Sequence, residues 1–152
     1  VHPSLVNRYF GSKEQLFAEA VPATFSVEPL LPDSAKGFGF QLAHYVLTKE
    51  KADFDATLAM VRSAGNGDAA RMLRAGLEER FVGPLADWLG APSADARAGM
   101  VVSVLAGVAI MRDVLGIDAL KADQDVVRQL LGETLEQIID RRPDDAAGDA
   151  AQ

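Results

Sequence analysis

The segment Ala98–Met111 constrains the fold more than any other, because it holds fourteen uncharged residues in a row between Arg97 and Arg112. That length falls short of the roughly 18–20 residues that a helix needs to cross a bilayer. We therefore predict a helix over residues 93–115 that other parts of the chain bury on most sides, and we predict no contact with a membrane.

Apolar side chains recur at spacings of three and four residues through the rest of the chain, which is typical of helices with one apolar face. The spacing predicts helices over residues 34–49, 53–63 and 68–90, the third bent near Gly83 and Pro84. It also predicts a last helix that begins near Asp123 or Asp125 and ends at residue 141. No stretch alternates as a strand would. The sequence thus predicts an all-α fold of about seven helices.

The balance of charge is acidic, with a formal net charge of −7 and a pI of about 4.7. Such a balance is unusual for a protein that binds nucleic acid. Residues 1–20, however, are neutral, because Arg8 and Lys13 balance Glu14 and Glu19, so the excess of acidic residues lies in residues 21–152. An acidic body is therefore compatible with a separate head that reads DNA.

Few residues suited to catalysis are present. His2 and His44 are the only histidines, and there is no cysteine. A disulfide, a thiolate metal site and a cysteine nucleophile are therefore excluded, while the redox compartment stays open. No metal-ligand spacing or nucleophile motif involves the histidines. We predict no enzyme, no catalytic residue, no metal site and no cofactor.

The first 21 residues, VHPSLVNRYFGSKEQLFAEAV, predict two short helices that meet at a corner. Pro3 suits the first turn of a helix, and Gly11 ends that helix. Ser12 and Gln15 then form a capping box that opens the second helix.

The first of these helices carries polar side chains that suit the major groove of DNA. Arg pairs with guanine, Asn with adenine, and Ser or Tyr with bases or phosphates, and the helix offers Ser4, Asn7, Arg8 and Tyr9. Lys13, in the first turn of the next helix, is placed to reach a backbone phosphate.

The pattern V-x-P-S-L-V-x-R-Y-F-x-S-K-E-x-L-F resembles the end of the DNA-binding domain of TetR-family transcriptional repressors. The resemblance covers the recognition helix and the start of the connecting helix, and it implies that the two preceding helices of a helix-turn-helix domain lie before Val1. It implies a set of DNA-binding residues: His2, Pro3, Ser4, Asn7, Arg8, Tyr9 and Lys13.

The resemblance also implies how the chain is divided. Residues 1–21 would be the C-terminal part of the helix-turn-helix domain with the connecting helix, and the proline-rich residues 22–33 would be a linker. Residues 34–142 would form a helical regulatory and dimerisation domain. Residues 143–152 have the composition of a disordered tail.

Gly99, Ser103 and Gly107 are spaced by four and would let another helix approach closely, either within the chain or from a second copy. TetR-like proteins dimerise through their last two helices, which places two recognition helices about 34–36 Å apart on a palindromic operator. The implied dimer interface comprises Gly99, Ser103, Gly107, Val127, Leu131, Leu135 and Ile138.

Family members also enclose a small effector, and flexible or aromatic side chains suit such a pocket, although the same residues are common in ordinary cores. The candidate ligand-binding residues are His44, Met60, Met72, Phe81, Trp88, Met111 and Arg112, with Met100 as a further apolar candidate. The resemblance therefore predicts a cytoplasmic homodimeric repressor that a small hydrophobic effector releases from double-stranded DNA. The alternative is an all-helical binding or adaptor protein that does not touch DNA.

Overall fold

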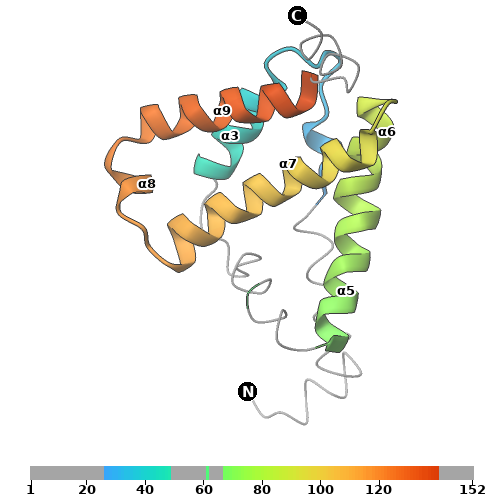
Figure 1. Cartoon of the computed structure of the whole chain (residues 1–152), viewed down its shortest axis with the longest axis horizontal. Helices are drawn as coiled ribbons and strands as arrows, with labels where there is room; N and C mark the ends of the chain where they lie inside the picture. The colour runs from blue at the N-terminus through green and yellow to red at the C-terminus, as the bar shows by residue number, and fades with distance from the viewer. Residues whose placement is uncertain (1–25, 49–60, 62–66, 141–152) are drawn as a thin grey trace, which may run out of the picture.

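The computed structural model describes residues 26–48, 61 and 67–140, and its regular elements there are all helical (Figure 1). The all-α fold class predicted from the sequence is thus confirmed. In chain order the elements are the 3-10 helix η1 (Glu28–Leu30), α3 (Phe38–Thr48), α5 (Gly67–Leu77), the π-helical η2 (Glu78–Val82), α6 (Gly83–Leu89), α7 (Ala94–Ala109), the π-helical η3 (Ile110–Val114), α8 (Ala119–Ala122) and α9 (Gln124–Asp140).

Two predicted helices differ in detail from the observed ones. The helix expected from residue 34 begins at Phe38, because Gly37 has a φ of +84°, a left-handed conformation that a helix does not contain. The helix expected over residues 68–90 is built from α5, η2 and α6, which follow one another without a loop (Figure 1). The irregularity expected near Gly83 is a π-helical turn that ends at Val82.

The start of α9 is fixed by a side-chain cap. The Asp123 carboxylate accepts a hydrogen bond from the backbone N–H of Val126 at 3.1 Å, as an N-cap does. This agrees with the predicted start near Asp123 or Asp125. The single turn α8, just before it, was not predicted from the sequence. The predicted helix 53–63 lies outside the described residues, apart from Val61.

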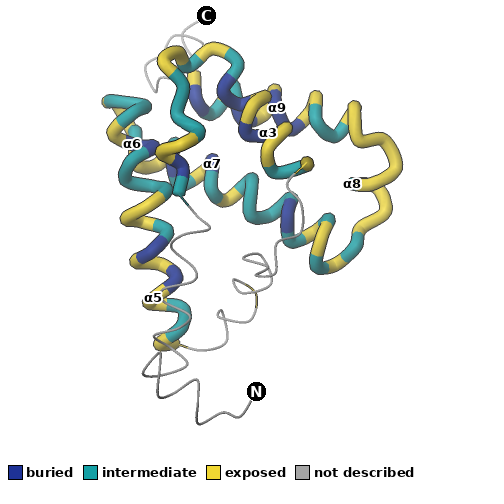
Figure 2. Tube along the Cα trace, turned by 180° about the vertical axis from the view of Figure 1, so that it is seen from behind, coloured by how far each residue is buried: buried dark blue, intermediate teal, exposed yellow. Residues whose placement is uncertain are grey.

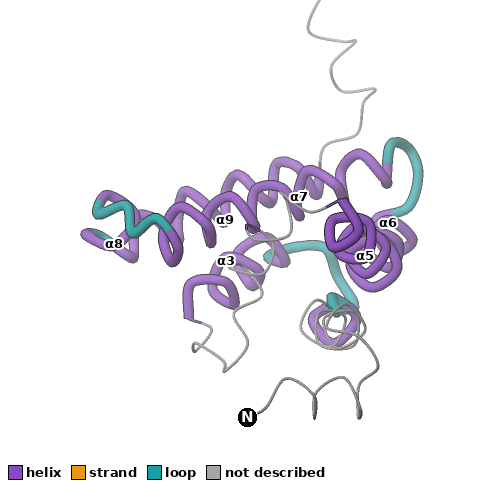
Figure 3. Tube along the Cα trace, turned by 90° about the horizontal axis from the view of Figure 1, so that it is seen from below, coloured by secondary structure: helices purple, strands orange, loops and turns teal. Residues whose placement is uncertain are grey.

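The core lies where α3, α6, α7 and α9 meet, and α3 packs chiefly on α9 (Figures 1 and 3). Its largest fully buried side chains are Phe38, Leu42, Leu85, Leu135, Val27 and Val101. Val27 belongs to the segment predicted as a linker, yet it is fully buried, and its N–H donates to the Arg80 carbonyl oxygen at 3.1 Å. This part of the segment therefore contributes to the core.

The helices α3 and α9 approach each other closely at Gly39. A Cβ atom on Gly39 would lie 2.5 Å from the Glu136 backbone nitrogen and 2.9 Å from the Gly132 carbonyl oxygen. The Gly39 N–H also donates to Glu136 Oε1 at 2.8 Å. Only glycine allows this contact, because the neighbouring atoms are backbone and cannot move independently.

The prediction that helix 93–115 is buried on most sides is wrong for the described chain. The continuous helix Ala94–Val114 has a mean hydropathy of 1.6 over its most apolar 18-residue window, yet only 17% of that window is buried. Met100 is 53% exposed and Met111 is 45% exposed. Figure 2 shows only short buried stretches along α7. By length and composition alone this helix is able to cross a bilayer, a test that the core helix of a soluble protein also passes. A large apolar surface of α7 and η3 is thus left uncovered within the described residues.

Candidate ligand groove and dimer face

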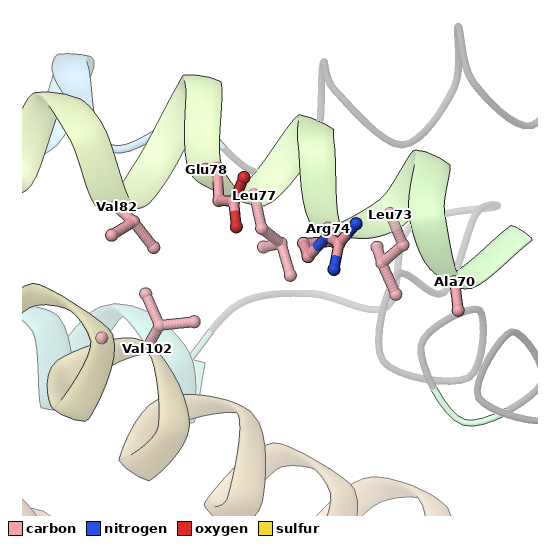
Figure 4. Close-up of a pocket in the computed structure, with 8 residues that line it drawn as sticks. Ala70, Leu73, Arg74, Leu77, Glu78, Val82 and Val102 are labelled. Atoms are coloured by element: carbon pink, nitrogen blue, oxygen red, sulfur yellow. The ribbon is translucent and has the colours of Figure 1, made fainter. Parts of the chain in front are cut away.

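A groove of about 330 Å³ lies between the column formed by α5 and η2 and the first half of α7 (Figure 4). Side chains of both walls point toward one another across it. The lining residues are Ala70, Leu73, Arg74, Leu77, Glu78 and Val82 on one wall, and Gly99 and Val102 on the other.

The groove is mostly apolar because of the spacing of residues along its longer wall. Ala70, Leu73 and Leu77 follow one another at three and four residues on α5, and so they share one face of the helix. On the opposite wall, Gly99 contributes no side chain, and a Cβ there would meet no described atom within 4 Å. Within the described part of the chain, the groove is therefore open beside Gly99.

Arg74 and Glu78 are the two charged residues of the groove. They lie four residues apart, on α5 and η2 respectively, and Figure 4 shows both side chains on the wall that faces α7. Among the described residues, neither side chain has a hydrogen-bond or ion-pair partner, whereas Arg71, also on α5, pairs with Asp68. The groove thus offers one cation and one anion at neighbouring positions beside an apolar surface.

None of the ligand-binding residues predicted from the sequence lines this groove. His44, Met72 and Met111 are exposed, and Phe81 is half-buried beside the core. Met60 lies outside the described residues. These residues were predicted from their chemical type, and the sequence does not indicate which helix faces are left uncovered by the rest of the chain.

Trp88 lines a second, smaller cavity. Its Nε1–H donates to the Pro32 carbonyl oxygen at 2.9 Å, and its ring meets Phe38 edge to face with centroids 5.0 Å apart. The cavity measures about 270 Å³ and is lined by Asp33, Ala35, Trp88, Leu89, Ala91, Arg97, Ile139 and Asp140.

Arg97 joins two helix ends at this cavity. Its guanidinium donates to the Ile139 carbonyl at 2.7 Å, to Gly90 at 2.7 Å and to Leu89 at 3.3 Å. These carbonyls belong to the C-terminal ends of α9 and α6, where backbone acceptors lack partners within the helix and the helix dipole favours a cation. The Arg97 Nε is buried and has no partner among the described residues.

Arg112 has a similar structural role at the other end of the apolar helix. Its side chain is 13% exposed, pairs with Asp113 at 2.8 Å and donates to the Val46 carbonyl in the last turn of α3 at 3.0 Å. Arg112 was predicted as a ligand contact, but the structure places it between η3 and α3. The two arginines that bracket the uncharged run therefore hold the C-terminal ends of three helices.

The predicted dimer residues lie in four different environments. Leu131 and Leu135 are 5% and 0% exposed and lie in the core of the chain itself, so neither is free to contact a second copy. Gly99 lines the groove, while Val127 and Ile138 are half-buried.

The remaining two predicted dimer residues leave a face of α7 open. Ser103 is exposed, and its hydroxyl donates to the Gly99 carbonyl at 2.8 Å. A Cβ at Gly107 would meet no described atom within 4 Å. The exposed large apolar residues from α7 to α9, called the apolar face below, are Met100, Met111, Leu115, Ile117, Val126 and Leu130.

All of the predicted DNA-binding residues lie in residues 1–25, which are outside the described residues. The predicted tail, residues 143–152, is also outside them. Four groove residues were not predicted from the sequence: Leu73, Arg74, Leu77 and Glu78. Their three-four spacing on one helix was visible, but a core-facing surface gives the same signal.

Comparison with protein families gives a match that covers residues 36–139 and is described as the tetracyclin repressor-like C-terminal domain. Searches of curated proteins and of solved structures found no match. The matched segment is more than half of the chain and runs from just before α3 almost to the end of α9. Together with the all-helical fold, this match shows that the chain belongs to the TetR family of transcriptional regulators.

Proposed function

We propose that this protein is a homodimeric, ligand-responsive transcriptional repressor of the cytoplasm, which a small hydrophobic effector releases from a palindromic operator. The observation that carries the proposal is the apolar groove between α5 and α7, inside the segment that matches the regulatory domain of the family. Open concave sites with apolar walls and few polar groups are the usual form of small-molecule sites.

The apolar face supports the homodimer. Exposed apolar residues that gather on a surface mark an interaction site, and here Met100 lies on α7 while Val126 and Leu130 lie on α9, the last two long helices. Two copies that pack through this face would form a closed, two-fold assembly. Such symmetry matches the two half-sites of a palindrome.

The groove and the proposed interface share one helix, since Gly99 and Val102 line the groove while Met100 and Met111 of the continuous α7–η3 helix belong to the apolar face. A ligand that binds more tightly to one spacing of α5 and α7 would shift the population toward that spacing. A shift of α7 would change the relative position of the two subunits and of the DNA-reading heads they carry.

The test uses the full-length protein. Selection of bound sequences from a random DNA pool should yield a palindrome, and Arg8→Ala should abolish the retention of that DNA in a gel shift. Arg128→Ala, a change of the same charge in α9, should leave retention unchanged. Failure to enrich any sequence would favour the adaptor alternative, and unchanged binding of the Arg8 variant would remove Arg8 from the DNA-reading set.

A further inference from the structure

We infer that the groove binds an elongated apolar molecule that ends in a carboxamide, or in another neutral group with a hydrogen-bond donor beside an acceptor. This inference rests on the ligand-binding part of the proposed function. It follows from the two groove charges, Arg74 and Glu78, which lie on the same wall and have no partners among the described residues.

The shape of the groove accounts for the apolar part of the ligand. The long wall extends from Ala70 to Val82, about three helical turns, and all of its members except Arg74 and Glu78 are apolar. A molecule that lies along this wall covers Leu73, Leu77 and Val82 and gains the free energy of removing apolar surface from water. The ligand is thus elongated, with a hydrocarbon portion.

The charges of Arg74 and Glu78 determine which polar group the end of the ligand carries. A ligand that covers them removes them from water, which is unfavourable unless each charge gains a partner. A carboxylate would pair with the Arg74 guanidinium but would bring a like charge to Glu78, and an ammonium group would do the reverse. A carboxamide satisfies both, because its carbonyl oxygen accepts from Arg74 and its N–H donates to the Glu78 carboxylate.

Three probes with the same hydrocarbon chain test this inference: octanamide, octanoate and octylamine. Their dissociation constants for the chain would be measured by isothermal titration calorimetry at pH 7, where the second is an anion and the third a cation. We expect octanamide to bind at least tenfold more tightly than either charged probe. Equal affinities, or a tenfold preference for octanoate or octylamine, would overturn the inference.

Neutral variants of the two charged residues identify the contacts. Glu78→Gln should reduce the ratio of the octanoate and octanamide dissociation constants at least fivefold. Arg74→Gln should reduce the ratio of the octylamine and octanamide dissociation constants by at least the same factor. Glu79→Gln and Arg80→Gln remove the same charges from neighbouring exposed residues outside the groove, and should change none of the ratios. Ratios that do not respond to Glu78→Gln and Arg74→Gln would also overturn the inference.

The failure of the inference can be told apart from the failure of the proposed function. If a charged probe binds best and Ala70→Glu, at a half-buried residue of the groove wall, abolishes its binding, the groove is a ligand site of another chemical class, and only the inference fails. If none of the probes binds, and a panel of apolar dyes and drugs leaves the melting temperature unchanged, the ligand-binding part of the proposed function fails as well.

Discussion

At the scale of single residues, Arg97 is the polar side chain whose contacts predict a clear loss of stability. It donates to three backbone carbonyls at the ends of α6 and α9. Hydrogen bonds from a charged group contribute about 1.5–3 kcal/mol, and unpaired buried acceptors add to the penalty. Arg97→Gln should therefore lower the free energy of unfolding by about 2–3 kcal/mol, measured by urea denaturation.

Arg128→Gln is the control for that change, because Arg128 makes an exposed ion pair with Asp125. Exposed pairs contribute about 0–1 kcal/mol, so this variant should unfold close to the wild type. If both variants lose the same stability, the carbonyl contacts of Arg97 are not the cause.

The partners of such residues could not be predicted from the sequence. Arg97 and Arg112 were visible only as the ends of an uncharged run, while Arg112 bonds to Val46, 66 positions away along the chain. A contact at that separation depends on how α3 and η3 pack, and the local pattern carries no information about it. In contrast, the Asp123 cap was predictable, because its partner Val126 is only three residues away.

At the scale of elements, the contact between α3 and α9 predicts that replacing Gly39 by alanine lowers the stability, whereas most Gly→Ala changes inside helices raise it. Gly→Ala inside a helix normally stabilises by about 0.5–1 kcal/mol. Gly39→Ala would instead place a Cβ within 2.5 Å of the Glu136 backbone nitrogen, so the two helices must separate. We expect a loss of about 1–3 kcal/mol in the free energy of unfolding.

Gly67→Ala supplies the comparison for Gly39→Ala. Gly67 is the first residue of α5, and a Cβ there would meet no described atom within 4 Å. It should leave the denaturation midpoint nearly unchanged. A Gly39→Ala variant as stable as Gly67→Ala would show that α3 and α9 adjust without cost.

The helices could be predicted from the sequence because the spacing of apolar residues that indicates a helix is found within a short stretch of chain. The all-α class, the α5–α6 column and the start of α9 follow from spacing, caps and breakers. The π-helical turns η2 and η3 were not predictable, since one additional residue in a turn leaves no mark on composition. The burial of Val27 was missed for a related reason: prolines around it indicate only that no long helix forms there.

At the scale of the whole molecule, the spacing of apolar residues in the sequence shows that one face of a helix is apolar, but it does not show which part of the protein covers that face. Leu131 and Leu130 are adjacent and equally apolar, yet the first is 5% exposed and the second 59% exposed. The fold of the chain itself buries one and leaves the other open. For the same reason the groove could not be located from the sequence, because a helix face that lines an open groove has the same apolar spacing as a face that packs on a core.

Leu130→Glu tests the proposed dimer at this scale. Because Leu130 is already 59% exposed in the single chain, the substitution should leave the helical content by circular dichroism unchanged. In a dimer formed through the apolar face, the added carboxylates would lose water without gaining partners, and so the dissociation constant should rise at least tenfold, or about 1.4 kcal/mol. Light scattering over a range of concentrations measures that shift. Met72→Glu places the same charge on α5, at a residue 37% exposed and outside the apolar face, and should leave the dimer intact. If the two variants have the same molar mass at every concentration, the apolar face is not where the copies meet, and the link between the groove and the subunit arrangement fails with it.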